Sequence, residues 1–341
     1  MPSDKKTKKL MNDPARIVPE MVAGICAAYP GHVMAHPQSE YVVLSRHRPL
    51  DGKVALVIGG GSGHEPAFPG YVGRGMAHAA ALGEVFTSPT PEPILLATRA
   101  VNTGGGVLYL YGNYAGDCLN FDMAAEMAEA EGIEVRTVTG KDDVASSTDP
   151  DMRRGIAGGF FLFKCAGAAA ERGDDLGEVE ALAKKTVASM RTMGVALGAC
   201  SLPAVLTPGF ELGAEEMEIG MGIHGEAGVR RGRLESADAV VDAMLDTIFS
   251  ELPLSSDDRC AVLINGLGAT STIEQYVATR RVHERLADRG VAVHRIHVGE
   301  YVTSLEMAGL SVTLMQLDTE LTELLDAPAD ACMYRQPART A

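Results

Sequence analysis

The segment Val54–Glu65, VALVIGGGSGHE, decides the fold class of this chain. Its first five residues are continuously apolar, which is typical of a strand buried on both faces of a sheet. They lead directly into Gly59–Glu65, where glycines bare the backbone and give a ligand close access to it. Because ligands of open parallel sheets bind beyond the carboxyl ends of the strands, this stretch is a candidate ligand loop.

The same order of strand, loop and helix recurs along the chain. Val107–Tyr111 is a second apolar run, followed by the loop Gly112–Asp117 and a helical stretch over Cys118–Ala130. This rhythm predicts an α/β fold with largely parallel or mixed sheets. We expect other helices over 13–28, 93–101, 160–171, 178–193, 236–250, 273–289 and 303–309, and other strands over 41–45, 134–138, 195–200, 218–224, 261–264, 291–298 and 311–317, with a loop over 30–40.

The length of 341 residues fits one large domain or two of ordinary size. We place the change of domain close to Gly194, after which strands and helices alternate again. The expected organisation is a flexible tail over 1–12, an N-terminal α/β domain over 13–193 and a C-terminal α/β domain over 194–341.

Composition excludes several classes of function. The net charge of −15 argues against nucleic acid and against an anionic membrane surface as partners. The basic N-terminal segment has no apolar run after it, so we expect no signal peptide, and no stretch has the apolar length of a membrane helix. The six cysteines are scattered without a Cys-x-x-Cys pair, which favours reduced core residues and a cytoplasmic location.

A second glycine-flanked histidine occurs in Met217–Gly228, MEIGMGIHGEAG. The simplest interpretation is a glycine-rich turn in which His224 caps a carbonyl. However, His64 stands among glycines in the same way far upstream. Two such histidines suggest one site assembled from two halves of the chain.

Common nucleotide and metal motifs are not matched. A dinucleotide fingerprint over Gly59–Glu65 would need glycine in place of His64, and the chain has no P-loop, so an NAD-dependent dehydrogenase is disfavoured. His64 lacks the second histidine of a zincin helix. His294 and His297, three apart on an expected strand, point to opposite faces, so we expect no metal site.

Asp117 is the candidate carboxylate. It follows a buried strand at the expected ligand edge of the sheet. It is equally well placed as the N-cap of a helix that starts at Cys118. The residues alone leave these two roles open.

Several ordered motifs together resemble the dihydroxyacetone kinases, and specifically their substrate-binding K subunit or domain. The resemblance covers nearly all of the chain after the tail. The motifs that carry it are GGGSGHEP at 59–66, GEVFTSPTP at 83–91, GNYAGDCLNF at 112–121, MGIHGEAG at 221–228, and NGLGAT, TSLEMAGLSVTL and LDAP further on.

The resemblance implies two α/β domains with a ketose site between them, and a homodimer. The residue matching His224 forms a covalent hemiaminal with the ketone carbon, and those matching His64 and Asp117 assist proton transfer. In this family the nucleotide and its magnesium are bound by a separate L subunit, sometimes recharged by a phosphotransferase-system phosphoprotein. This chain is therefore expected to bind no cofactor itself. The residues expected to line the site are Gly61, Ser62, Gly63, His64, Gly112 and Asp117.

One position departs from the family pattern. Members that use dihydroxyacetone usually carry a lysine where this chain has Gly112. The missing side chain leaves room for a larger ketose such as erythrulose or apulose, unless Arg74 or Lys141 supplies the charge. A non-catalytic co-regulator that senses a ketose is the alternative from a different class.

Overall fold

The computed structural model describes residues 6–47, 49 and 51–338, and it divides the chain into two compact units. Each unit is assembled from separate segments of the chain. Unit 1 comprises 1–15, 141–158 and 189–318, and unit 2 comprises 16–140, 159–188 and 319–341.

This division differs from the single boundary expected near Gly194. Residues 141–158 belong to unit 1 because their backbone bonds to its first strand: Thr192 N–H donates to Asp142 O, and Val144 N–H donates to Thr192 O, at 2.8 and 3.1 Å. The C-terminal residues return to unit 2, where Asp330 pairs with Arg74 in a small sheet.

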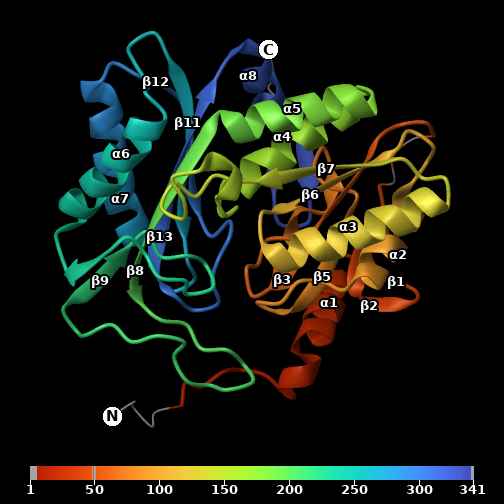
Figure 1. Ribbon diagram of the computed structural model, residues 1–341, viewed down its shortest axis with the longest axis horizontal. Coiled ribbons are helices and arrows are strands. Elements are labelled where there is room, and N and C mark those ends of the chain that lie inside the picture. The colour runs from red at the N-terminus through yellow and green to blue at the C-terminus, as the bar shows by residue number, and fades with distance from the viewer. Residues whose placement is uncertain (1–5, 48, 50, 339–341) are drawn as a thin grey trace. The chain divides into compact units, whose positions relative to one another are not determined.

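Unit 2 is built on a six-stranded sheet in the order β1-β2-β5-β3-β6-β7 (Figure 1). The last four strands in that order are parallel, whereas β1, β2 and β5 pair antiparallel. A smaller sheet joins β15, β14 and β4. The strands are β1 (Val33–His36), β2 (Ser39–Ser45), β3 (Ala55–Ser62), β4 (Gly73–Arg74), β5 (Ala79–Val85), β6 (Val107–Gly112), β7 (Val135–Gly140), β14 (Ala329–Ala331) and β15 (Arg335–Gln336).

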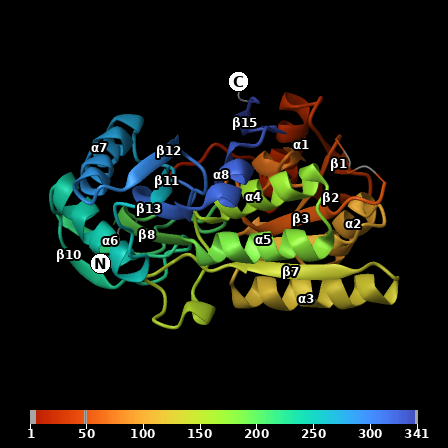
Figure 2. The ribbon, with the colours of Figure 1, turned by 90° about the horizontal axis from the view of Figure 1, so that it is seen from above.

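Helices cover both faces of the main sheet of unit 2, which explains its continuously apolar strands. On one face, Val57 and Tyr109 pack with Ile94 of α2 and Phe121 of α3. Figure 2 shows α3 and α5 on opposite sides of β7. The helices are α1 (Ile17–Ala28), α2 (Pro91–Val101), α3 (Ala115–Ala130), α4 (Gly159–Arg172), α5 (Leu176–Ala188) and α8 (Thr319–Asp326).

Unit 1 contains a mixed sheet in the order β10-β9-β8-β13-β11-β12, in which only β11 and β12 are parallel. Helices α6 and α7 pack on its core through residues such as Leu245 and Val282. The elements are β8 (Met190–Gly198), β9 (Glu216–Ile219), β10 (Arg230–Arg233), α6 (Ala237–Glu251), β11 (Arg259–Gly266), α7 (Thr272–Asp288), β12 (Ala292–Gly299) and β13 (Ala308–Leu317).

Two expectations about elements were wrong. Residues 30–40 contain the strand β1 rather than only a loop. Residues 303–309 form no helix, because nearby backbone groups bond to the end of β11 instead. Asn265 Oδ1 accepts the N–H groups of Tyr301 and Val302 at 2.9 and 2.8 Å, and Ser304 N–H donates to Leu267 O.

The expected tail is partly ordered. Thr7 N–H donates to Leu206 O at 2.7 Å, and Lys9 pairs with Glu306 at 2.6 Å, so residues 6–12 are not the flexible segment we expected. Residues 1–5 lie outside the described part of the chain. No helix among the described residues has the length and apolar character needed to cross a membrane.

Candidate functional site

The glycine-rich segment of unit 2 is the end of a strand and the turn that follows it. β3 continues through the glycines to Ser62, whose Oγ donates to Gly83 O at 2.8 Å and so ties β3 to β5. A Cβ at Gly61 would lie 2.7 Å from the backbone nitrogen of Thr87, which leaves no room for a side chain. Gly63 has φ +99°, a conformation that favours glycine. The glycines therefore set the backbone path that places the next residue, His64.

His64 is held by a ring contact. It is 3% exposed and stacks on Phe86 with 5.0 Å between ring centroids and 14° between planes. Phe86 has φ +57°, a strained conformation for an aromatic residue, and its N–H bonds to Ser62 O at 2.9 Å. The motif GEVFTSPTP thus supplies the surface against which the histidine is fixed.

A partly buried carboxyl group, that of Glu65, follows His64. Both carboxylate oxygens of Glu65 accept the Gly63 N–H at 3.1 Å. Burial raises the pKa of this group, although the backbone hydrogen bonds oppose that shift. Glu65 closes the turn and was not among the residues expected to form the site.

Asp117 lies in the first turn of α3 rather than before it. The helix begins at Ala115, with Tyr114 at the N-cap position, so the alternative role of Asp117 as the cap is wrong. Its side chain is buried, at 8% exposure. Because β3 and β6 are adjacent and parallel, the His64 turn and the start of α3 follow the same edge of the sheet. Both segments therefore lie at the carboxyl edge of this sheet.

Gly112 is the last residue of β6, where it pairs with Gly140 of β7 and is partly exposed. Arg74 does not replace the lysine expected there: its guanidinium pairs with Glu171 at 2.7 Å. The carbonyl of Glu171 in turn accepts from Lys53, which precedes β3, so Arg74 belongs to the opposite, amino edge of the sheet.

Lys141, the other residue considered as a replacement, follows Gly140 along the chain. Its ammonium group lies 3.1 Å from the carboxylate of Asp151. Its charge is therefore already engaged by a carboxylate on the protein surface.

The second histidine, His224, is fixed in unit 1 by a carboxylate two residues away. Its Nδ1 lies 3.0 Å from Glu226 Oε1, and its backbone N–H donates to Glu226 Oε2 at 3.0 Å. Gly225 has φ +86° and donates to Gly222 O, which closes the loop. The loop therefore presents a histidine whose ring is oriented by an acidic partner.

Two charged residues support Glu226, and the sequence analysis had named none of the three. Arg154 Nη1 lies 3.6 Å from Glu226 Oε2, while its Nη2 lies 2.9 Å from Oδ2 of the buried Asp143. Burial raises the pKa of Glu226, but the hydrogen bond and charge of His224, together with Arg154, outweigh it and hold the pKa at about 2. Burial raises the pKa of Asp143 to about 6, against the effect of Arg154.

Other features of the described residues do not coincide with this chemistry. A cavity of about 950 Å³ in unit 2 lies among α4, α8 and the C-terminal strands, and none of the expected site residues lines it. Among the same residues, no group of three His, Cys, Asp or Glu side chains is placed to hold a metal ion.

The fold and these loops define an α/β protein of the ligand-binding class, in which each unit offers a histidine on a glycine loop. A family model, the Dak1 domain, matches residues 23–333, and the chain belongs to that family. The predicted fold, the dihydroxyacetone kinase family, the K-subunit type and the kinase class are thereby confirmed.

Similar proteins extend over nearly the whole chain. It is 45% identical to the dihydroxyacetone-binding subunit DhaK of PTS-dependent dihydroxyacetone kinase 2 from Listeria innocua, over 96% of this chain and 99% of that one. It is also 45% identical to L-erythrulose 1-kinase from Mycolicibacterium smegmatis, over 97% of this chain and 59% of the relative. The solved structure of the dihydroxyacetone kinase operon co-activator Dha-DhaQ matches with a TM-score of 0.88 and 33% identity, covering 94% and 99%.

Proposed function

We propose that this chain is the ketose-binding subunit of a dihydroxyacetone-kinase-type phosphotransferase. It binds a short ketose covalently through His224 and presents the terminal hydroxyl to a nucleotide-bearing L subunit. The observation that carries this proposal is the histidine on an open glycine loop with Glu226 against Nδ1. The Listeria relative, named as a dihydroxyacetone-binding subunit, supports it over its full length.

The chemistry of the loop suits a ketone. A neutral imidazole nitrogen is a nucleophile that adds reversibly to a carbonyl carbon. The resulting hemiaminal selects for a carbonyl group, which glycerol lacks, so polyols are rejected by reactivity rather than by shape. It also fixes the substrate before transfer, which lowers the orientation cost of the reaction.

Asp117 and His64 are proposed to handle the protons of the transfer. Asp117 accepts the proton of the terminal hydroxyl as that oxygen attacks phosphorus. His64, fixed by its stack on Phe86, shares the proton or steadies a substrate oxygen. The phosphoryl group would come from a nucleotide bound with magnesium on the L subunit. Its ultimate source is ATP or a phosphotransferase-system phosphoprotein. We also propose a homodimer and a cytoplasmic location.

The test is a titration with dihydroxyacetone carrying carbon-13 at its carbonyl. We expect a new tetrahedral-carbon signal in the wild-type protein and its loss in His224→Ala. His283→Ala, which removes an exposed histidine of α7, serves as the matched control and should retain the signal. If neither labelled dihydroxyacetone nor labelled erythrulose gives this signal with folded protein, His224 is not the nucleophile.

Two alternatives rest on specific observations. Gly112 and the similarity to L-erythrulose 1-kinase favour a ketose larger than a triose. The similarity to the co-activator Dha-DhaQ favours a subunit that binds a ketose without turnover. Displacement of the labelled triose by erythrulose tests the first, and phosphorylation in the presence of an L subunit tests the second.

A further inference from the structure

We propose that Glu226 is both the positioning residue and the counter-ion of His224. In this role it determines which ring nitrogen attacks the ketose, and it neutralises the charge that the ring gains in the covalent adduct. The inference rests on the proposed function, in which His224 forms a hemiaminal.

Glu226 contacts His224 at two points, the ring and the backbone. One carboxylate oxygen lies 3.0 Å from ring Nδ1, and the other accepts the backbone N–H of the same residue at 3.0 Å. A single carboxylate therefore fixes the ring relative to its own backbone. A side chain that only stabilised the turn would need the second contact alone.

The loop around Glu226 is built to accommodate this carboxylate. A Cβ at Gly222 would lie 2.1 Å from Glu226 Oε2 and 2.5 Å from Arg154 Nη1, so a side chain there would displace the carboxylate or the guanidinium from this arrangement. Arg154 is itself held by Asp143, which accepts from its Nε and Nη2 at 3.0 and 2.9 Å. Arg154 thus stands between two carboxylates and favours the ionised form of Glu226.

An ionised carboxylate at Nδ1 decides the tautomer of a neutral imidazole. The proton stays on Nδ1, facing Glu226, and the lone pair lies on Nε2. In the addition step, the Nε2 lone pair forms the bond to the carbonyl carbon. The π electrons of the C=O bond move to oxygen, and that oxygen takes up a proton from solvent.

The adduct then carries carbon on Nε2 and hydrogen on Nδ1, so the ring has a positive charge. Beside Glu226 this charge is retained as an ion pair, and each bound ketose takes up one proton. Without the carboxylate charge, the ring would release the Nδ1 proton, and addition would take up none. Proton uptake therefore distinguishes a counter-ion from a residue that only shapes the loop.

The experiment measures ketose affinity and proton uptake by calorimetry at about pH 9, where an ordinary histidine is neutral, in buffers of different ionisation enthalpy. The ligand is dihydroxyacetone, or erythrulose if that displaces it. Glu226→Gln keeps the shape and an acceptor oxygen but removes the charge, and Glu226→Asp keeps the charge. Glu218→Gln is the control, because Glu218 also accepts a backbone N–H of the same segment, from Gly228 at 2.6 Å.

We expect uptake near one proton in the wild type, in Glu226→Asp and in Glu218→Gln. In Glu226→Gln, uptake should fall towards zero and affinity about ten-fold or more, because a charged hydrogen bond becomes a neutral one. Unchanged uptake and affinity in Glu226→Gln, with the covalent carbon-13 signal present, overturn this inference and leave the proposed function standing. Absence of the covalent signal in the wild type overturns both.

Discussion

At the scale of single residues, the motifs identified the histidines and Asp117, but not the groups that orient them. His64, His224 and Asp117 are marked in the sequence by glycines or by the end of a buried strand. Arg154 and Asp143 lie far from His224 along the chain, and a lone pair of charges has no periodicity that a sequence could reveal. Glu226 could have been predicted from the sequence, because an acidic residue two positions after a loop histidine can form a hydrogen bond with the histidine ring.

Gly112 carries the prediction about substrate size. Gly112→Lys restores the side chain usual in dihydroxyacetone-using relatives at the end of β6. We expect it to shift the ratio of affinities for dihydroxyacetone and erythrulose about ten-fold towards the triose, because it fills space and adds a hydrogen-bond donor. Displacement of the labelled triose measures this ratio. Gly31→Lys adds the same charge at an exposed loop glycine with open space around it, and should leave the ratio unchanged. An unaltered ratio in Gly112→Lys would remove Gly112 as a determinant of specificity.

At the scale of elements, long apolar runs were predicted well, and short or alanine-rich strands were not. β3 is buried along its whole length and β6 up to its last residue, and both are central in the sheet of unit 2. β5, over Ala79–Val85, is rich in alanine and has a single β-branched residue, Val85, yet it lies between β2 and β3 with its first five residues buried. Its position in the sheet, which is a long-range property, decides its structure.

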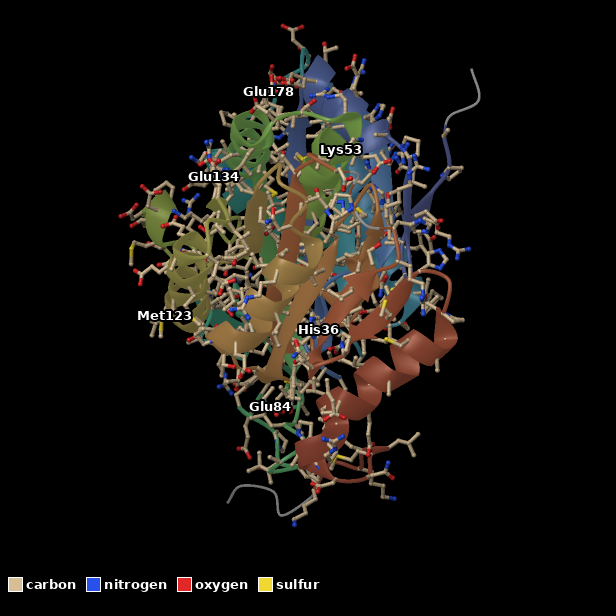
Figure 3. The ribbon with its side chains drawn as sticks, turned by 90° about the vertical axis from the view of Figure 1, so that its right-hand side faces the viewer. His36, Lys53, Glu84, Met123, Glu134 and Glu178 are labelled. Carbon is tan, nitrogen blue, oxygen red and sulfur yellow. The ribbon has the colours of Figure 1, made fainter. Side chains whose placement is uncertain are left out.

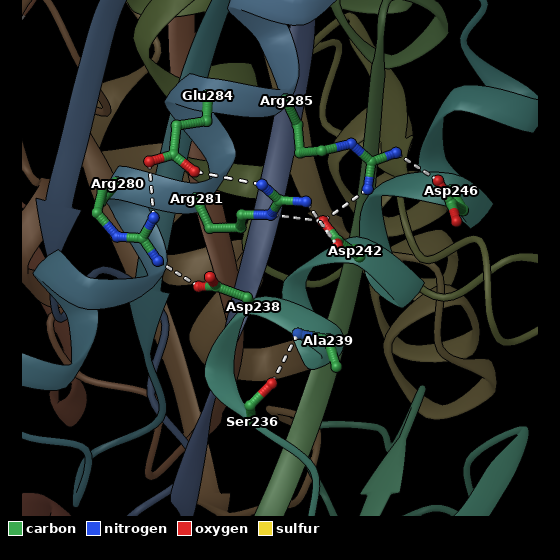
Figure 4. Close-up of polar contacts among 9 residues, drawn as sticks. All are labelled: Ser236, Asp238, Ala239, Asp242, Asp246, Arg280, Arg281, Glu284 and Arg285. Carbon is green, nitrogen blue, oxygen red and sulfur yellow. Dashed lines mark hydrogen bonds and ion pairs between the residues drawn. The ribbon is translucent and has the colours of Figure 1, made fainter.

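The surface between α6 and α7 allows a test of element packing (Figure 4). Asp242 accepts from Arg281 at 2.8 Å and from Arg285 at 2.6 Å, and Arg280 pairs with Asp238. The hydrogen bond from Arg281 has the largest effect and lowers the pKa of Asp242. Burial opposes it, and the hydrogen bond from Arg285 and the charges of both arginines lower the pKa further.

We expect Asp242→Asn to lower the free energy of unfolding by about 0.5–1 kcal/mol at neutral pH, a small value because the network is partly exposed and screened by salt. Because the folded pKa lies below the unfolded one, this contribution is present above about pH 4 and is lost as pH falls through the folded pKa. Urea unfolding at neutral and acid pH measures it. Glu215→Gln, in a more exposed pair with Arg233, should change little. Equal effects of Asp242→Asn at both pH values would contradict the electrostatic origin.

At the scale of the whole molecule, the number of units was predicted but not their composition. Two consecutive domains were expected, because strand and helix patterns along a sequence do not indicate which distant segments pair. The structure shows segments of both units alternating along the chain. Figure 3 also shows the exposed side chain of Met123 on the outer side of α3.

We expect this chain to bind the ketose and a separate L subunit to be required for phosphoryl transfer. The chain alone, given a ketose and magnesium ATP, should bind the ketose covalently but release no phosphorylated product, because no nucleotide motif occurs in it. Addition of an L subunit from the same organism should start phosphorylation, which phosphorus-31 NMR can monitor.

Asp117→Asn should keep the covalent carbon-13 signal and slow phosphorylation by about 10²–10⁴-fold, since a general base is lost. Asp122→Asn, an exposed acid on the same helix, is the control. Covalent binding in the wild type without phosphorylation by the L subunit would instead make the chain a ketose sensor.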